Sequence, residues 1–218
     1  MTNLVNNYYQ STTVADAKLL KRGQFCWAPG QYLPTSITTL ELIDYNPTDE
    51  RCNRYVVLPN PPRNVIFNHT PVHELHLEHD EELLVIKAKK RLFLVISQAP
   101  ISGIPGANRL RGDGFVCLPL YSFHSTDAPE FLARIRVLEY PWWLYMPENT
   151  TFRIKESFAR LDRLQVIEKN MIEPIQVALT NDALFLVSEW LRYYLTGEIE
   201  PIFLEDRQQM IQALSTTP

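Results

Sequence analysis

The sequence predicts a mainly β protein of the α+β class, built as a small barrel or strongly bent sheet with helices packed at one end. Short apolar runs with β-branched residues recur along residues 24–168 and are typical of strands. Sixteen prolines against seven glycines favour bent connections over long helices. From residue 181 the apolar spacing changes to that of a helix. Strands followed by helices indicate this architecture.

The clearest strand covers residues 92–97, Leu-Phe-Leu-Val-Ile-Ser. A short uninterrupted apolar run with β-branched residues is typical of a strand that is buried on both faces. An earlier strand over residues 24–27 should be closed by a turn at Pro29-Gly30. Further strands are predicted over residues 36–45, 53–58, 83–87, 115–123, 131–140 and 151–156, and a turn and strand over residues 158–168.

The last part of the chain is predicted to be helical. Leu184, Val187, Leu191 and Leu195 recur at helical spacing and give one apolar stripe. Thr180 or Asn181 can cap the start of this helix, and Gly197 should end it. A second helix is expected over about residues 203–214, so the C-terminal helices together cover about residues 181–215.

Composition bounds the class of protein. The formal net charge of -4 gives no global field that favours nucleic acid or membrane, so an anion site must be a local patch. The three cysteines lie far apart without a CxxC pair, which suggests neither a zinc site nor a disulfide framework. The first twenty residues lack the layout of a signal peptide, and no apolar run approaches a membrane span. We therefore expect a cytoplasmic protein without a membrane partner.

Four histidines form the first set that could carry chemistry. His69, His73, His76 and His79 lie in an acidic stretch. On a helix the first three could share a face and converge on a metal, but on a strand His73 and His79 would share a face without His76. Because the local alternation favours a strand, we interpret the set as a solvated polar face and predict no metal site.

Two charged clusters and one aromatic cluster have both a functional and an ordinary interpretation. The run from Lys87 to Arg91 precedes a buried strand and could meet a phosphate, or it is a solvated face. The carboxylate and cations of residues 153–163 suit base catalysis on a phosphodiester, or they form an ion-pair network. The aromatic run over residues 140–145 could stack bases, or it belongs to the core or a dimer interface.

Four sequence blocks follow one another along the chain and can be compared with known families: KRGQFCW, KKRLFLVIS, GFVCLPLYSF and FARLDRLQVIE, followed by a terminal helix. This order resembles the MazF/PemK/Kid family of toxin proteins, whose members carry blocks such as RGEIWWV, RRPVLVLS, VVVPITS and DQVRTLDRRRL. The resemblance covers roughly half of the chain. Residues 30–86 have no family counterpart of that length, so we interpret them as a β-rich insertion. The expected organisation is an N-terminal arm over residues 1–20 and a single domain over residues 21–218.

The resemblance implies a fold and an activity. The family fold is an SH3-like small β-barrel that forms a homodimer. Many members are metal-independent, sequence-specific endoribonucleases that an antitoxin neutralises. Because the 2′-hydroxyl of the RNA itself attacks the phosphate, no cofactor is implied. The expected partners are therefore RNA, an antitoxin protein and a second copy of the chain.

Family positions carry over residue by residue. Arg91 matches the arginine of the RRP block, and Ser122 matches the final serine of PITS, with Tyr121 where threonine is usual. Glu156 falls at the acidic position of DQ, and Arg160 begins the segment that fits RTLDR.

One family position is not matched. The family's catalytic arginine, two residues before the acid, falls on Ile154, which Arg153 and Lys155 flank. On a regular strand these two cations would point to the opposite face from Ile154.

The leading hypothesis is therefore a MazF/PemK-like endoribonuclease. In it Glu156 is the general base, Arg91 with Arg153 or Lys155 holds and neutralises the scissile phosphate, and Ser122 positions it. The remaining expected substrate-binding residues are Tyr121, Lys89, Lys90, Lys155 and Arg160. A rival hypothesis, favoured by Ile154, is a non-catalytic barrel that binds nucleic acid or an antitoxin-like peptide in the same groove. A third is a structural dimer module whose histidine-rich loop is its working part.

Overall fold

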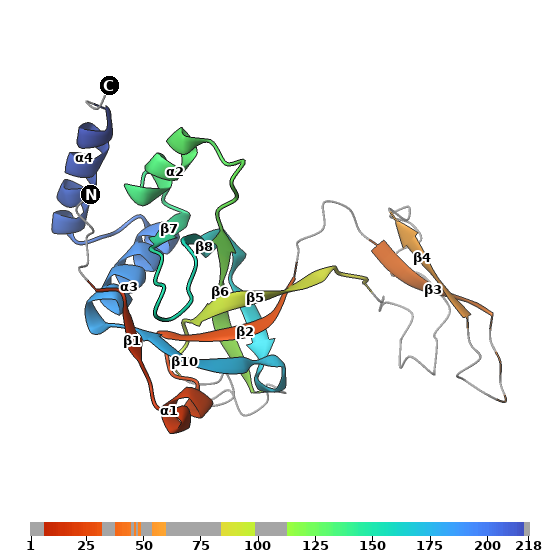
Figure 1. Cartoon of the computed structure of the whole chain (residues 1–218). Coiled ribbons are helices and arrows are strands. Elements are labelled where there is room, and N and C mark those ends of the chain that lie inside the picture. Colours follow the sequence, from red (N-terminus) through yellow and green to blue (C-terminus); the bar gives the residue numbers. More distant parts are fainter. Residues whose placement is uncertain are drawn as a thin grey trace. The chain divides into compact units, whose positions relative to one another are not determined.

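The computed structural model describes residues 7–31, 38–44, 46, 48, 54–59, 84–98 and 113–215 (Figure 1). The chain divides into two units, residues 1–30 with 90–218, and residues 31–89. The second unit overlaps the segment that the family resemblance sets apart. The four histidines lie outside the described residues. No helix in the described ranges is long and apolar enough to cross a membrane.

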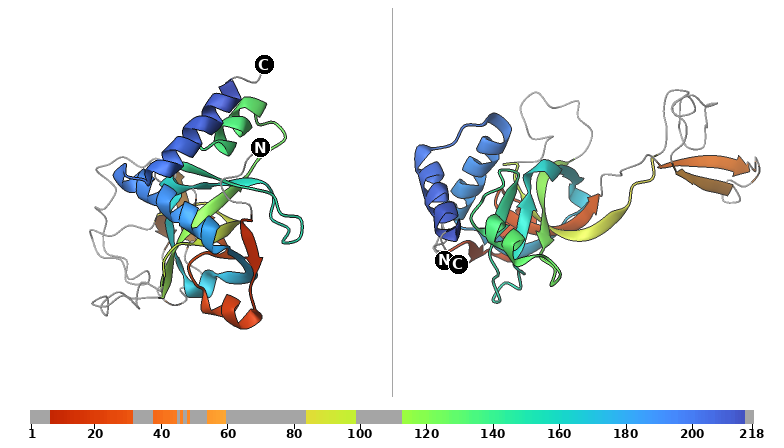
Figure 2. Two further views of the ribbon diagram at one scale, coloured as in Figure 1. Left: turned by 90° about the vertical axis from the view of Figure 1, so that its left-hand side faces the viewer. Right: turned by 90° about the horizontal axis from the view of Figure 1, so that it is seen from above.

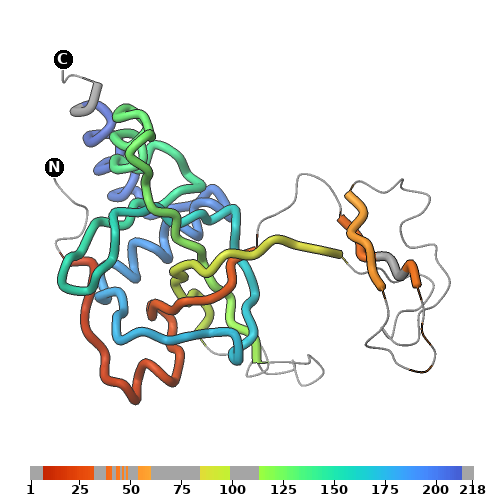
Figure 3. Tube along the Cα trace, turned by 45° about the vertical axis from the view of Figure 1, so that its right-hand side comes forward, coloured from red at the N-terminus to blue at the C-terminus, as the bar shows by residue number. Residues whose placement is uncertain are grey.

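The first unit is built on an eight-stranded sheet in the order β1-β10-β2-β5-β6-β8-β7, with β9 paired to β6. Figure 3 shows β1 beside β10, in agreement with their antiparallel pairing. The strands are β1 Tyr9–Ser11, β2 Gln24–Gln31, β5 Ala88–Val95, β6 Gly114–Ser122, β7 Trp143–Met146, β8 Ser157–Arg160, β9 Gln165–Glu168 and β10 Glu173–Leu179. The protein is thus mainly β, and among the described strands the pairings do not close a barrel.

Six helical segments accompany these strands in the part of the first unit that the structure describes. They are α1 Val14–Leu19, α2 Pro129–Arg136, α3 Asn181–Thr196 and α4 Pro201–Ser215, with the short 3-10 turns η4 Leu161–Arg163 and η5 Lys169–Met171. Figure 2 shows α3 and α4 side by side, and the rings of Phe185 and Phe203 meet 5.7 Å apart between them. The second unit contains the antiparallel pair β3 Thr38–Asp44 and β4 Arg54–Pro59.

The buried strand predicted over residues 92–97 is confirmed over residues 92–95, the second half of β5, which ends before residues 96 and 97. Phe93, Leu94 and Val95 have no exposed surface. Leu94 belongs to one hydrophobic cluster, whereas Phe93 and Val95 belong to a second. Successive side chains of a strand point to opposite faces, so β5 is buried on both sides here.

The first C-terminal helix is confirmed with its predicted ends. The Thr180 hydroxyl accepts a hydrogen bond from the Ala183 amide, and Gly197 adopts φ 76° as the left-handed cap. Trp190 is fully buried and its indole N–H donates to the carbonyl of Trp143 at 3.2 Å. The helix is thereby fixed against β7. The second predicted helix is confirmed as α4.

The predicted turn at Pro29-Gly30 is wrong, because β2 continues through both residues to Gln31. The last pair of β2 with β10 is Trp27 with Glu173. Pro29 lies beyond that pair, so its missing N–H removes no hydrogen bond to β10.

The predicted strand over residues 131–140 is also wrong, since α2 covers Pro129–Arg136. Proline at the first helical position and an extended Ala128 before it start the helix. Phe131, Ile135 and Leu138 match helical spacing, whereas Phe131, Ala133, Ile135 and Val137 match alternation, so the pattern fits both periods. Pro129 at the start of the segment therefore favours the helix over the strand.

Two other segments differ from their predictions. Residues 151–153 form a turn rather than a strand, and Ile154 makes a single bridge with Asn149 before β8 begins. Residues 84–87 contain one bridge, at Leu84, and the continuous strand starts at Ala88. The predicted strands over residues 36–45, 53–58 and 115–123 are confirmed as β3, β4 and β6.

Candidate nucleic-acid interface

Strands β6, β8 and β7 expose one face and bury the other. Buried residues alternate with partly exposed ones along β8 and β7, and at the end of β6 the buried Leu120 is followed by the partly exposed Tyr121. The buried face carries Leu120, Leu144, Met146 and Ala159, which belong to one hydrophobic cluster. The side chains of the other face are mostly aromatic or cationic, where an antiparallel sheet usually presents ordinary polar groups to water.

A row of paired residues crosses this exposed face. Tyr121 pairs with Phe158, and Phe158 pairs with Tyr145. Directly paired residues lie on the same face of a sheet, so three aromatic side chains stand in line across β6, β8 and β7. The rings of Tyr121 and Phe158 are stacked, with centroids 5.8 Å apart and planes 22° apart.

The row continues onto β5 and β2 through Arg91 and Gly30. Phe93 of β5 pairs with Pro119 of β6. Because the strands are antiparallel, two residues back along β5 and two residues forward along β6 bring Arg91 beside Tyr121. Its guanidinium carbon lies 4.2 Å from the centre of the Tyr121 ring, a cation–π contact. A Cβ atom on Gly30 would lie 2.9 Å from Arg91 Cδ. Glycine thus lets the arginine stem lie close against β2.

A second cation approaches the same ring. The guanidinium carbon of Arg160 lies 5.6 Å from the Tyr121 ring centre. Asp162 holds this guanidinium through two hydrogen bonds, of 3.0 Å from Nε and 2.5 Å from Nη2. The hydrogen bonds with Asp162 raise the pKa of Arg160. We name Gly30, Arg91, Tyr121, Phe158 and Tyr145, with Arg160, the Tyr121 row.

More rings surround Phe158. Its ring centroid lies 5.2 Å from that of Phe123 and 5.3 Å from that of Trp143. Phe131, from α2, makes an edge-on contact with Phe158 at 6.3 Å. The aromatic run over residues 140–145 is therefore divided, with Leu144 in the core and Trp143 on the exposed face.

A carboxylate lies at one end of this face. Glu156 Oε1 accepts hydrogen bonds from Arg136 Nε at 2.8 Å and from the Tyr145 hydroxyl at 2.7 Å. Arg136 Nη2 lies 2.6 Å from the same oxygen, and 27% of the Glu156 side chain is exposed. Burial, followed by the interaction with Glu156, raises the pKa of the Tyr145 hydroxyl, which therefore stays protonated at neutral pH. A carboxylate, a guanidinium and a phenol thus meet at one accessible point.

Of the residues expected to act, Arg91, Tyr121 and Arg160 are brought together in the Tyr121 row. Glu156 lies on the same face, two residues before Phe158 along the chain.

Arg153 and Lys155 lie outside this arrangement. Arg153 sits exposed on the turn with φ 55°, and Lys155 is exposed. Between them Ile154 is 2% exposed and belongs to the core. The position of the family's second arginine is thus a core position in this chain.

The other expected substrate-binding residues are spread out. Ser122 lies exposed next to Ser157, with 3.4 Å between their hydroxyl oxygens. Alternation turns it away from the face that Tyr121 shares. Lys90 forms an ion pair of 2.5 Å with Glu173 of β10. Lys89 belongs to the second unit and is exposed.

Arg136 and Tyr145 were not identified from the sequence as site residues. The strand predicted over residues 131–140 puts Arg134 and Arg136 on one face, whereas on α2 the two arginines separate. Arg134 pairs with Glu139 and Arg136 pairs with Glu156. The signal that could have found Arg136 is Pro129 after Ala128, which marks the start of a helix. For Tyr145 the signal was its alternation with the apolar Leu144 and Met146.

Within the described ranges no group of three or more histidine, cysteine, aspartate or glutamate side chains is arranged to hold a metal ion. Cys26 and Cys117 are buried with free thiols. No protein-family model matches the chain, and no curated protein matches it in sequence.

Proposed function

We propose that this protein binds single-stranded RNA on the Tyr121 row, as a MazF/PemK-like protein with an SH3-like barrel. One observation carries the proposal. The partly exposed Tyr121 ring has Arg91 at 4.2 Å and Arg160 at 5.6 Å on a face that also carries Phe158 and Trp143. Sequence-tolerant binding of single strands combines rings on which bases stack with cations that follow the phosphates.

The charge distribution supports a local rather than a general attraction. The whole chain carries a formal charge of -4, which repels nucleic acid at long range. Binding must therefore come from the cations of the row and from stacking. We expect an affinity that falls with salt, though with a modest slope, because few phosphates are neutralised.

The test is fluorescence anisotropy with a labelled single-stranded RNA of mixed sequence at two salt concentrations. We expect saturable binding that Tyr121→Ala weakens by about 1–3 kcal/mol, the usual value for one stacked base. The matched control is Phe185→Ala, which removes an exposed ring of α3 and should leave affinity unchanged. Absence of binding at low salt, or equal losses in the two variants, would contradict the proposal.

A second candidate function, metal-independent cleavage of RNA, is favoured by the contacts of Glu156. In this mechanism Glu156 takes the proton of a 2′-hydroxyl, and the resulting oxygen attacks the adjacent phosphorus. The bond to the 5′-oxygen breaks, giving a 2′,3′-cyclic phosphate and a 5′-hydroxyl. Tyr145 can donate the proton that the leaving oxygen needs, and Arg136 can oppose the charge of the phosphorane.

This assignment gives Arg136 the role that the leading hypothesis from the sequence gave to Arg153 or Lys155. The decisive assay uses long single-stranded RNA with a chelator present. Products should end in a 2′,3′-cyclic phosphate and disappear in Glu156→Gln. Glu139→Gln, which removes the carboxylate paired with Arg134, is the matched control and should still cleave. Intact RNA at a high concentration of the protein, or unchanged cleavage in Glu156→Gln, would contradict the cleavage proposal and leave only the proposal of RNA binding.

The resemblance extends the proposal to two protein partners. A second copy of the chain would form a homodimer, which light scattering during size-exclusion chromatography measures directly. An antitoxin-like peptide would cover the same face as RNA. Such a peptide should compete with RNA and lose affinity in Tyr121→Ala, whereas a peptide that binds elsewhere would form a ternary complex.

A further inference from the structure

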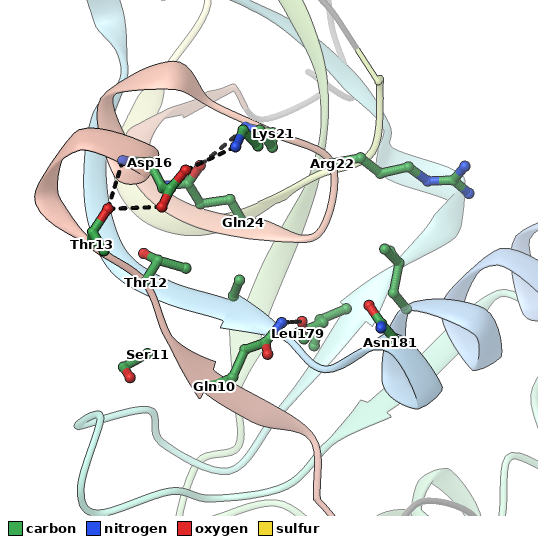
Figure 4. Close-up of a pocket in the computed structure, with 12 residues that line it drawn as sticks. Gln10, Ser11, Thr12, Thr13, Asp16, Lys21, Arg22, Gln24, Leu179 and Asn181 are labelled. Atoms are coloured by element: carbon green, nitrogen blue, oxygen red, sulfur yellow. Dashed lines mark hydrogen bonds and ion pairs between the residues drawn. The ribbon is translucent and has the colours of Figure 1, made fainter.

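The polar cavity in Figure 4 is lined by charged side chains that bond within the chain. It has a volume of about 390 Å³ and opens between β1, the connection from α1 to β2, the end of β10 and the start of α3. Lys21 Nζ donates to Asp16 at 2.8 Å. Arg22 reaches in the other direction, where its Nη2 donates to the Ser188 hydroxyl at 2.7 Å. These side chains do not converge on one point of the cavity.

The C-terminal helix α4 makes a contact that leads toward Glu156. Figure 2 shows this helix beside α2, in agreement with the contacts of Arg207. Arg207 donates from Nε to the carbonyl of Leu138 at 2.7 Å and from Nη2 to the carbonyl of Glu139 at 2.6 Å. Its guanidinium carbon also lies 6.0 Å from the centre of the Trp190 ring of α3. Arg207 therefore joins the end of α2 to the last two helices.

The end of α2 is a strained turn. The Leu138 amide donates to the carbonyl of Ile135, and the Glu139 amide donates to the carbonyl of Arg134, each at 3.0 Å. Helices that end with this pair of hydrogen bonds usually carry glycine at the left-handed position after the cap. Here that position is Leu138, with φ 54°. A leucine adopts this conformation at a cost in free energy, and only where the surrounding structure holds it there.

Two kinds of contact hold the turn in place. The Leu138 side chain is 3% exposed and belongs to the same hydrophobic cluster as Leu144. The carbonyls of Leu138 and Glu139 follow the last turn of the helix and accept from Arg207 instead. A cation is also favourable at this place, because the C-terminal end of a helix carries partial negative charge. The core thus holds the side chain of the turn, and Arg207 holds its backbone.

Arg136 connects this turn with Glu156. It is the last residue of α2, two residues before Leu138. Its Nε donates to Glu156 Oε1 at 2.8 Å, and the Tyr145 hydroxyl donates to the same oxygen at 2.7 Å. We name Glu156, Arg136 and Tyr145 the Glu156 group. Tyr145 lies on β7 and Glu156 directly precedes β8, whereas Arg136 comes from α2. The place of Arg136 in the group therefore depends on where the end of α2 is held.

We propose that Arg207 is a positioning residue of the Glu156 group, because it holds the end of α2 where Arg136 reaches Glu156. Its effect on the rate of cleavage rests on the cleavage function proposed above, whereas its effect on Arg136 does not. A guanidinium opposes the charge of a phosphorane only from a fixed place. Arg207 should therefore affect the cleavage rate. RNA affinity should not change, because Tyr121, Arg91 and Arg160 lie on strands outside α2.

Nitrogen-15 NMR of the arginine Nε–H groups, on the full chain, tests the structural step. The Arg136 signal is identified by its loss in Arg136→Lys. In Arg207→Gln we expect this proton to exchange with water about tenfold faster, the effect of losing one charged hydrogen bond. Arg207→Lys can reach one carbonyl at a time, so it should show a smaller increase, and it carries the test if Arg207→Gln does not fold. Gln208→Ala, at the next and exposed residue of α4, is the matched control and should change nothing. An unchanged Arg136 signal in the folded Arg207 variants overturns the proposal.

Single-turnover cleavage of RNA tests the functional step. Arg207→Gln should lower the cleavage rate by about tenfold or more, because a misplaced group loses most of its catalytic effect, while RNA affinity stays unchanged. In an Arg136→Gln background the same change should lower the rate no further, since no guanidinium remains to be positioned. An equal loss in both backgrounds means that Arg207 acts on the fold as a whole, which overturns the proposal. A chain that binds RNA without cleaving it contradicts the cleavage function instead, and the Arg136 signal then decides on the role of Arg207.

Discussion

Alternate residues of strands β6, β8 and β7 form the two faces of this part of the sheet. Different interactions hold the side chains of each face. The inner face carries Leu120, Leu144 and Ala159, each at most 4% exposed. The outer face carries Tyr121 and Phe158, whose rings stay partly exposed and are held by arginines and by one another. The inner face is explained by folding alone, because burying apolar surface is its whole contribution.

The outer face is not explained in the same way. A sheet that needs only to face water carries polar side chains there. Here large rings remain in contact with solvent and two guanidinium groups lie against a single tyrosine. Contiguous exposed apolar surface on a folded domain marks an interaction site more often than a structural one. The contrast predicts that substitutions on the inner face change stability, and substitutions on the outer face change binding.

The largest effect is expected at Ile154, where the family resemblance and the structure disagree. Ile154→Arg restores the family residue, but it places an unpaired charge in a site that is 2% exposed. We expect it to lower the free energy of unfolding by on the order of 4 kcal/mol. Urea denaturation measures this loss. A stable variant with increased RNA cleavage would instead show that this position faces the site.

A neighbouring pair on β6 gives the cleanest contrast between the faces. Leu120→Ala removes a side chain that is 4% exposed and should cost about 2–5 kcal/mol of unfolding free energy. Tyr121→Ala, one residue later, should cost about 1 kcal/mol, because its ring is partly exposed. Denaturation and RNA anisotropy are measured on both variants. Equal losses of stability, or equal losses of affinity in the folded proteins, would remove the distinction between the faces.

How far the sequence predicts this arrangement depends on whether a pattern fits one period or two. The uninterrupted run around Leu94 and the capped helix from Asn181 each fit one element, and both are confirmed. Residues 131–140 fit both periods, and the wrong choice concealed the contact of Arg136 with Glu156.

Long-range pairing was the other obstacle. Tyr9–Ser11 is a strand because it pairs with residues 177–179, far along the chain. Its three residues carry no periodic pattern from which a strand could be predicted. The Tyr121 row likewise exists through strand register, since its six residues come from five strands, with Phe158 and Arg160 both on β8. The family resemblance points to Arg91, Tyr121 and Arg160, but which of these side chains meet depends on that register.

Arg91 should affect the salt dependence of binding more than it affects stability. Arg91→Gln keeps a long polar side chain and removes the cation above Tyr121. If Arg91 contacts one phosphate, the slope of log K against log salt falls by about 1. Lys18→Gln is the matched control, because it removes an exposed cation of α1. An unchanged slope in Arg91→Gln would show that the guanidinium of Arg91 contacts the Tyr121 ring and does not bind an RNA phosphate.

The smallest expected effect separates these two roles of Arg91. Gly30→Ala leaves every charge and ring of the row in place, but its new methyl group would lie 2.9 Å from Arg91 Cδ and 3.1 Å from Phe93 Cζ. Phe93 is fully buried and cannot retreat, so the flexible arginine stem must move away from β2.

The displaced guanidinium loses part of its contact with Tyr121, which is worth about 0.5–1 kcal/mol at an exposed site. We expect RNA affinity to fall by a factor of about 2–5 with an unchanged salt slope, since the charge remains. Gly30→Ala in an Arg91→Gln background should add nothing further, because the stem no longer positions a cation. An equal loss in both backgrounds would mean that Gly30 acts on the strand rather than through Arg91, and the outer face would then be set by backbone shape instead of by its side chains.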